Sequence, residues 1–422
     1  MPEQHVENLV SHLFRHESGK MAAVLTRLLG FGNIEAAEDI VQDTLLKAVT
    51  VWKYKGIPEN PQAWLYTVAK RKAIDFLRQK KLRAALHEQI SVMAQSEWTL
   101  SPGVDQLFRE HEIEDSQLRM IFACCHPEIP YESQIALTLK TLCGLSIAEI
   151  AQSFLTQEET IVKRLYRARE KIRSENIALE VPGPQALPAR LEAVLHSLYL
   201  LFNEGYHSSH PELLIRYDLC EEAMRLCLLL TCNRMTDTPE SNALLALMCL
   251  QASHEDARTD AAGEIVRLKD QDRRLWNREL IEKGVYYLNR ASENSEPGEY
   301  HIEAAIAAYH ALAETFEHTN WLGIVALYES LSRIKPGPVV EMNKAIALGY
   351  CQSPRAAIEA LLKIRGLEQS YHYYAALGDF YGALPDADRA IEVYDRAISL
   401  VTTRAERTLL ERKRAELVSD ND

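Results

Sequence analysis

Apolar residues recur at helical spacing along almost the whole chain. No segment shows the alternation of apolar and polar residues that is typical of a half-buried strand. Glycine and proline interrupt the helical pattern at 30–33 and at 56–61. The pattern therefore predicts helices from residue 35 to about 52 and from residue 62 to about 83, within an all-α fold.

Further breaks in the pattern divide the chain into parts. Residues 84–110 are weakly patterned and contain Ser-Pro-Gly at 101–103, which favours a linker. The closely spaced prolines near 182–188 cannot continue a helix, so they mark a second boundary. We expect domains at 1–85, 111–180, 189–295 and 299–418, with linkers at 86–110 and 181–188.

The last of these parts contains a repeat. When Ala305, Pro338 and Tyr371 are aligned as position 1, the units lie 33 residues apart. Small and bulky residues then share fixed positions, as in a solenoid of paired helices, which we favour over a plain helical bundle. At positions 8, 20, 24 and 27 these residues are Leu312, Ala345 and Gly378; Ile324, Ala357 and Ala390; Tyr328, Leu361 and Tyr394; and Leu331, Ile364 and Ala397. The third unit resembles the tetratricopeptide pattern most closely.

A helix-turn-helix is predicted between residues 145 and 173. Ser146 is a candidate N-cap for a short first helix with apolar residues at helical spacing. The second helix has a predicted buried face of Ile161, Leu165, Ala168 and Ile172, and its basic residues are Lys163, Arg164, Arg167 and Arg169. Such a helix can lie in the major groove of DNA, although a short helix pair also occurs as ordinary packing.

The charge is distributed unevenly along the chain. The net charge is −13, but residues 1–180 carry only −2 and the remaining residues carry −11. Basic residues cluster at 70–83 and at 163–173, each at the end of a helical motif. Because local basic surfaces rather than net charge bind phosphates, the two clusters favour a nucleic-acid partner over two merely solvated helix faces.

Other candidate chemistry is weaker. The Cys-Cys-His segment at 124–126 has no second Cys/His pair at zinc spacing, so we predict buried thiols and no metal, cofactor or catalytic residue. Cys220, Cys227 and Cys232 fall near helical spacing on an apolar face and are expected in the core. The cysteines lie in apolar helical stretches, and no apolar run approaches the length of a membrane span. We therefore expect reduced thiols, a cytoplasmic location and no membrane partner.

The most specific motif lies between residues 36 and 78. An acidic segment that includes Glu38, Asp39 and Asp43 is followed by Trp52, a loop with proline and asparagine, and a Trp-Leu-Tyr segment that ends in basic residues. This order resembles region 2 of an extracytoplasmic-function (ECF) sigma factor, and the helix-turn-helix after a linker resembles its region 4. The segments at 115–127, 202–206, 244–248 and 270–276 resemble the subgroup with a long C-terminal extension that ends in tetratricopeptide-like repeats.

The resemblance implies an alternative sigma subunit that binds core RNA polymerase at the β′ coiled coil and the β flap, recognises promoter DNA and helps to open it without covalent chemistry. It implies that polymerase is bound by Asp39, Gln42 and Asp43. It implies that the −10 element is bound by Lys55, Asn60, Lys70, Arg71, Lys72 and Arg78. It implies that the −35 element is bound by Thr160, Lys163, Arg164, Arg167 and Arg169. Trp64, Leu65 and Val68 are expected in the core rather than against bases.

One departure from the family pattern affects the −35 prediction. Glu158, Glu159 and Val162 stand where the family has small or hydroxyl residues and a lysine. Two carboxylates suit the start of a helix dipole but repel phosphate. This departure from the family pattern therefore predicts an unusual −35 sequence.

Two other functions are consistent with parts of the pattern. A stand-alone helix-turn-helix regulator with a tetratricopeptide-type domain for an effector or protein would bind duplex DNA tightly by itself as a dimer. An enzyme built on 189–295 would need a pocket with perturbed acid–base groups. For the sigma factor, the charge of −11 and the proline boundary lead us to expect that the extension regulates activity in cis. The alternative is that it docks on polymerase or on a signalling protein through the concave face of the repeats.

Overall fold

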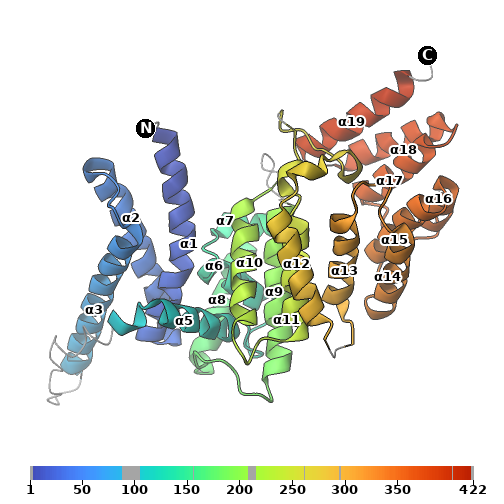
Figure 1. Ribbon diagram of the computed structural model, residues 1–422. Coiled ribbons are helices and arrows are strands. Elements are labelled where there is room, and N and C mark those ends of the chain that lie inside the picture. Colours follow the sequence, from blue (N-terminus) through green and yellow to red (C-terminus); the bar gives the residue numbers. More distant parts are fainter. Residues whose placement is uncertain are drawn as a thin grey trace. The chain divides into compact units, whose positions relative to one another are not determined.

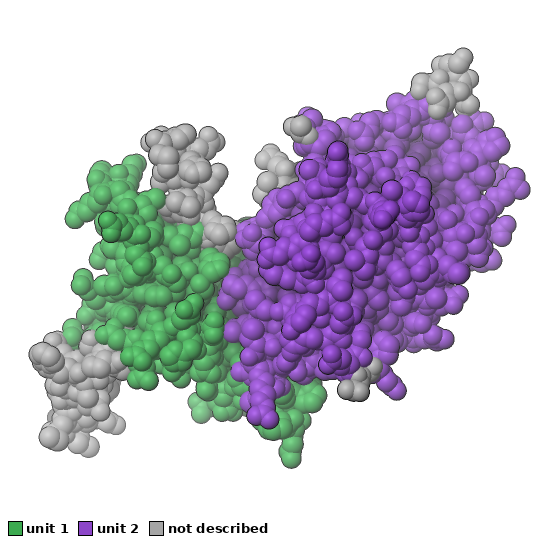
Figure 2. Space-filling model, viewed as in Figure 1, with its two compact units in different colours: residues 1–201 green, residues 202–422 purple. Residues whose placement is uncertain are grey.

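The computed structural model describes residues 3–87, 105–154, 156–207, 215–260, 262–293, 296–401 and 403–419, and within them every regular element is a helix (Figure 1). The predicted all-α fold is confirmed. Most of the linker predicted at 86–110 lies outside the described residues. No helix in the described ranges is long and apolar enough to cross a membrane. The chain divides into two compact units, unit 1 (1–201) and unit 2 (202–422), which Figure 2 distinguishes by colour.

Unit 1 begins with three long helices, α1 (Glu3–Leu29), α2 (Ile34–Lys55) and α3 (Pro61–His87), with the 3₁₀ turn η1 (Phe31–Asn33) after α1. Gly30 and Gly56 adopt φ values of 88° and 78°, a left-handed region that favours glycine, so each glycine ends a helix. The core contains Trp52, whose ring centroid lies 5.7 Å from that of Phe14 and 5.5 Å from that of Trp64. Leu65 and Val68 are buried and Trp64 is half-buried.

The second half of unit 1 contains α5 (Glu110–Cys124), α6 (Tyr131–Thr141), α7 (Ile147–Ser153) and α8 (Glu158–Ser174). Helices α7 and α8 form the predicted helix-turn-helix. The Ser146 hydroxyl accepts a hydrogen bond from the Glu149 amide at 3.1 Å, and the Glu149 carboxylate accepts one from the Ser146 amide at 2.7 Å, so a capping box starts α7. The buried side of α8 is the predicted one: Ile161, Leu165, Ala168 and Ile172.

Helix α9 (Leu187–Tyr206) begins within the proline-rich segment. Its Arg190 donates a hydrogen bond to the Phe122 carbonyl of α5, and Cys125 Sγ lies 3.9 Å from Ser197 Oγ. These contacts join the first part of α9 to the second half of unit 1. Unit 1 accordingly ends inside α9, after residue 201.

Unit 2 continues with α10 (Tyr217–Thr231), α11 (Pro239–Ala252), the 3₁₀ turns η2 (Glu255–Ala257), η3 (Leu268–Asp270) and η4 (Arg273–Leu275), and α12 (Arg278–Ala291). Helix α11 packs against α10, α12 and α13. The repeat region consists of α13 (Glu299–Leu312), α14 (Trp321–Ile334), α15 (Pro338–Cys351), α16 (Pro354–Leu361), α17 (Tyr371–Gly382), α18 (Ala387–Leu400) and α19 (Arg404–Ser419), and successive helices pack on one another (Figure 1).

The predicted repeat phase fits the second and third helix pairs but not the first. Pro338 and Tyr371 are the first residues of α15 and α17. Ala305, however, lies inside α13, and Leu312 is 61% exposed instead of buried. Helix α13 begins at Glu299, 39 residues before Pro338 instead of 33, so a strict 33-residue spacing places Ala305 inside the helix.

The cysteines are all free. Most are buried, as expected, including Cys124, Cys125, Cys220 and Cys227. The prediction for Cys232 was wrong, since this residue is exposed. It caps the C-terminus of α10, where the chain turns away from the apolar face.

Candidate nucleic-acid interface

The exposed side of α8 carries two of the predicted cations. Lys163 and Arg167 are exposed one helical turn apart, and Tyr166, 59% exposed, lies beside them. Charge patterning does not single out Tyr166, but an exposed ring next to two cations suits contact with a base or a sugar. Thr160 is half-buried in the first turn of the same helix.

Arg164 points to a neighbouring helix instead. Its guanidinium forms an ion pair with Glu132 of α6 at 2.6 Å and lies over the Phe154 ring, 5.6 Å from the centroid. These contacts hold the Arg164 side chain against α6 and Phe154, whereas Lys163 and Arg167 are exposed to solvent.

Arg169 and Arg173, farther along α8, contact α2. Arg169 lies 2.5 Å from a Glu38 carboxylate oxygen and 3.6 Å from one of Glu35, and Arg173 lies 2.9 Å from Glu35. Thr141 of α6 donates a further hydrogen bond to Glu38 at 2.9 Å. We call these ion pairs between α8 and α2 the clasp. Arg169 and Glu38 are only 19% and 13% exposed, so the clasp removes a predicted DNA contact from the surface.

Two more contacts join the halves of unit 1. Arg27 of α1 forms ion pairs with Glu112 and Asp115 of α5 at 2.8 and 2.9 Å. Gly19 of α1 lies against the chain after α6, where a Cβ atom would stand 1.9 Å from the Leu142 carbonyl oxygen. A larger residue at position 19 is therefore incompatible with this packing.

The exposed side of α2 has acidic and apolar residues. Asp39, Gln42 and Asp43 are exposed, as their predicted role requires. Leu46 and Val49 continue the same side at 65% and 51% exposure. Both apolar residues lie at helical spacing from Asp39, so the sequence predicts that they share its side of α2. Composition alone does not show that they are exposed.

The basic side of α3 is partly neutralised by acidic neighbours. Arg71 is exposed, and no ion pair is found for it within the described residues. The other cations have partners: Lys70 with Asp105 at 2.8 Å, Lys72 with Asp43 at 2.8 Å, and Arg78 with Asp75 at 3.3 Å. The Lys72–Asp43 pair joins a residue predicted to contact DNA to one predicted to contact polymerase.

The remaining predicted residues lie at the end of α2 and in the loop before α3. Lys55 and Asn60 are both exposed. Asn60 Oδ1 accepts a hydrogen bond from the Ala63 amide at 2.9 Å, so this side chain caps the N-terminus of α3. Its amide group is thereby held at the edge of the loop.

A buried carboxylate fixes α3 against α1. Glu17 accepts hydrogen bonds from the Tyr66 hydroxyl at 2.5 Å, from Lys20 at 3.1 Å and from Gln62 at 3.3 Å. Burial acts to raise the pKa of Glu17, but hydrogen bonds from His16 and Tyr66 and the charge of Lys20 outweigh it and lower the pKa to about 2. Glu17 is therefore ionised in the folded chain near neutral pH.

Comparison with known proteins identifies three parts of the chain. Residues 13–83 match sigma-70 region 2, residues 119–172 match sigma-70 region 4, and residues 190–292 match DUF6596, a family of unknown function. The chain is 37% identical over 392 residues to an uncharacterized protein of Rhizobium meliloti (strain 1021), which covers 92% of each chain. No solved structure matches.

Two relatives have named functions. The chain is 30% identical over 142 residues to RNA polymerase sigma factor SigV of Bacillus subtilis (strain 168), covering 33% of this chain and 76% of SigV. It is 28% identical over 158 residues to the ECF RNA polymerase sigma-E factor of Haemophilus influenzae, covering 37% of this chain and 81% of the relative.

An α2–α3 unit with an acidic and a basic side, followed by a helix-turn-helix with exposed cations, defines a promoter-recognition factor of the sigma-70 class. The chain belongs to the ECF sigma factors of that family and carries a long helical C-terminal extension. It is thus an alternative sigma factor for transcription initiation.

Proposed function

We propose that this sigma factor binds core RNA polymerase through the exposed side of α2, the −10 element through α3 and its preceding loop, and the −35 element through α8. The observation that carries the proposal is the order of the two matched sigma regions, each of which presents an exposed charged helix side. We further propose that it acts in the cytoplasm, with no cofactor and no catalytic step.

The polymerase contact combines charge with apolar area. Asp39, Gln42 and Asp43 provide an acidic patch that suits a basic partner such as the β′ coiled coil. Leu46 and Val49 add exposed apolar surface next to it, as the centre of a protein interface requires. The β flap is the expected partner of the helix-turn-helix half.

The −10 contact uses Lys55, Asn60, Lys70, Arg71, Lys72 and Arg78. A base that leaves the duplex loses stacking and pairing worth a few kcal/mol, so the loop around Asn60 has to supply new contacts to it. Because Arg71 is exposed and unpaired among the described side chains, we expect it to make the strongest phosphate contact of this group.

The −35 contact centres on Lys163 and Arg167, with Tyr166 beside them and Thr160 at the helix start. Arg164 and Arg169 can join only after they leave Glu132 and Glu38. Glu158 and Glu159 are both exposed in the first turn of α8 and repel phosphate there.

Promoter binding requires the clasp to open. The −10 and −35 elements are named for their positions upstream of the transcription start. They therefore lie about 25 base pairs apart, or roughly 85 Å at 3.4 Å per base pair. In the structure α8 is in direct contact with α2 through Arg169 and Glu38. Region 4 must therefore separate from region 2, and we propose that polymerase drives this by competing for the acidic side of α2.

The extension regulates this activity in cis under our proposal. Residues 181–422 carry a net charge of −11, against −2 for residues 1–180. An acidic body tethered to basic helices competes with DNA phosphates for the same cations. The repeats remain the predicted site for a protein partner.

Run-off transcription with purified core polymerase, with and without the full chain, tests the sigma activity. Defined transcripts that require the chain are expected, and Arg167→Ala should reduce them while core binding is unchanged. Lys171→Ala, in the last turn of the same helix, is the matched control. Tight duplex binding by the chain alone, with neither core binding nor transcripts, would instead favour a stand-alone regulator.

A further inference from the structure

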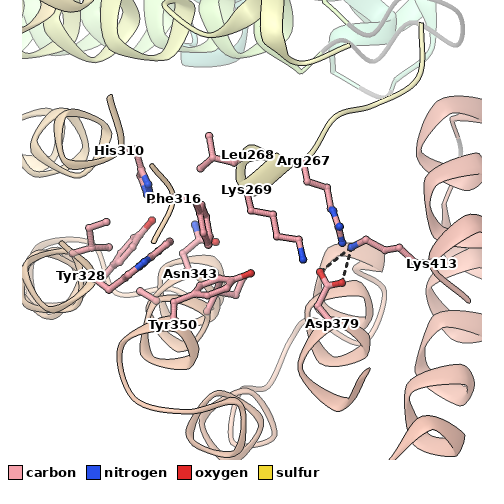
Figure 3. Close-up of a pocket in the computed structure, with 14 residues that line it drawn as sticks. Arg267, Leu268, Lys269, His310, Phe316, Tyr328, Asn343, Tyr350, Asp379 and Lys413 are labelled. Atoms are coloured by element: carbon pink, nitrogen blue, oxygen red, sulfur yellow. Dashed lines mark hydrogen bonds and ion pairs between the residues drawn. The ribbon is translucent and has the colours of Figure 1, made fainter. Parts of the chain in front are cut away.

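A cavity of about 310 Å³ lies within unit 2, lined by η3 and its preceding residue and by side chains of the repeat region (Figure 3). We call it the repeat pocket. Its volume is in the range of pockets that bind small organic ligands. Neither sigma region contributes to its lining, so it is separate from the polymerase and DNA contacts proposed above.

One side of the repeat pocket is aromatic. The rings of Trp321 and Tyr350 stack with centroids 4.7 Å apart and an interplanar angle of 28°. The Phe316 ring meets both of them edge-on with centroids 5.0 Å away. Together they offer flat apolar surface on which another planar group can stack.

His310 adds a polar group on the aromatic side. Its ring lies edge-on to Trp321 with centroids 5.3 Å apart, and its Nδ1 is buried without a hydrogen-bond partner among the described residues. Burial and the nearby charge of Arg273 lower the pKa of His310 to about 4. The imidazole is therefore neutral near pH 7 and adds no charge to the pocket.

The other side is cationic. Figure 3 shows Arg267, Lys269 and Lys413 turned toward Asp379 of α17. Lys413 donates hydrogen bonds to both carboxylate oxygens of Asp379 at 2.7 and 2.9 Å, and the Tyr394 hydroxyl donates a third at 2.7 Å. These three hydrogen bonds hold the Asp379 carboxylate in place.

The charges on this side do not balance. Asp379 pairs with Lys413, and Asp270 pairs with Arg267 at 2.6 Å. Lys269 has no ion pair within the part of unit 2 that the structure describes, and its side chain points toward Asp379. One positive charge is left over at the cationic end, beside a stacked aromatic wall.

We propose that the repeat pocket binds a small organic monoanion with a flat, aromatic or conjugated body. Its carboxylate or sulfonate group lies against Lys269 and Arg267, and its planar part lies against Trp321 and Tyr350. The charge of −11 on residues 181–422 disfavours polyanions, so a single negative charge at this local site is the best match. This inference does not rest on the proposed promoter contacts.

Isothermal titration of the full chain with 2-naphthoate tests the proposal, with 2-naphthamide as its uncharged analogue. We expect one saturable site per chain for the acid and at least tenfold weaker binding of the amide. Lys269→Gln should weaken naphthoate at least fivefold, because it removes the unbalanced charge without burying a polar group. Lys363→Gln, an exposed lysine elsewhere in the repeats, should leave the affinity unchanged.

A second variant tests the aromatic side. Trp321→Leu should weaken naphthoate at least fivefold while the circular dichroism of the chain is retained. If 2-naphthoate and 2-naphthamide bind equally well, the site is an apolar cleft that does not select an anion, and the proposal is overturned. The proposal is also overturned if naphthoate shows no saturable binding, or if Lys269→Gln binds it as tightly as the unaltered chain.

Discussion

Different contacts join α8 to α2 in unit 1 and the repeat helices to one another in unit 2. In unit 1, α8 meets α2 through Arg169, Arg173, Glu35 and Glu38, charged side chains near the surface. In unit 2, repeat helices meet through buried residues, with Phe380 against Gly349, and with Ala357 and Ala390 fully buried.

The difference predicts different mechanical behaviour. A partly exposed ion pair contributes about 0–1 kcal/mol and is weakened by salt. Buried apolar packing is not screened and costs several kcal/mol to disrupt. The α8–α2 contact of unit 1 is therefore the easier of the two to open, as the proposed promoter binding requires, whereas the repeat packing of unit 2 holds the residues that line its pocket in place.

The largest effect is expected from breaking the packing of unit 2. Phe380→Ala should lower its free energy of unfolding by about 3–5 kcal/mol, because a buried ring leaves a cavity that its neighbours fill only in part. Denaturant unfolding followed by circular dichroism measures this. Leu362→Ala, at an exposed position, should change the free energy by less than about 0.5 kcal/mol. Similar losses for both variants would contradict the comparison.

The next largest effect on stability is expected from Glu17, the buried carboxylate that holds α3 against α1. The folded chain holds the pKa of Glu17 at about 2, below its ordinary value of 4.5, so the carboxylate stabilises the fold above pH 4.5. This contribution, about 3 kcal/mol, is lost as the pH falls from 4.5 toward 2. Glu17→Gln should remove most of it at pH 7 and flatten the stability curve over that interval. Equal slopes for the two proteins in pH-dependent unfolding would exclude this role.

A substitution that leaves the charge unchanged can also weaken the packing between the halves of unit 1. Gly19→Ala places a Cβ against the Leu142 carbonyl and should weaken the association of the halves by about 1–3 kcal/mol. Small-angle X-ray scattering should then report a larger radius of gyration. Gly32→Ala, where a Cβ meets nothing within 4 Å, is the control and should leave the radius unchanged.

The smallest effect is expected for the clasp itself. Arg169→Glu should free α8 at a cost of about 1 kcal/mol and raise amide hydrogen exchange along that helix. Added salt should have a similar, weaker effect on the unaltered chain. Combining Arg169→Glu with Glu38→Arg should restore slow exchange, and failure of this reversal would show that the ion pair does not hold the halves together.

Much of the fold could be predicted because helical periodicity is local. The buried side of α8 is Ile161, Leu165, Ala168 and Ile172, as the sequence spacing predicts. Ser146 caps α7, since its hydroxyl is three residues from the amide that it satisfies. The first repeat does not fit the predicted phase, because α13 begins 39 residues before α15 whereas α15 begins 33 residues before α17.

The candidate site was less predictable from the sequence. Lys163, Arg164, Arg167 and Arg169 look alike in a pattern of basic residues. Their surroundings differ, because Glu132 holds Arg164 and Glu38 holds Arg169, and only Lys163 and Arg167 of the four are exposed. Exposed Tyr166, Leu46 and Val49 were missed because composition does not report exposure.

The sequence by itself determined the helices, their buried sides and the order of the two sigma regions, because each depends on residues within a few helical turns. Tertiary structure decided which charges remain available. Arg169 and Glu38 lie 131 positions apart in the chain, and Lys413 and Asp379 lie 34 apart. Such pairs form only when separate helices pack, so the clasp and the repeat pocket exist only in the folded protein.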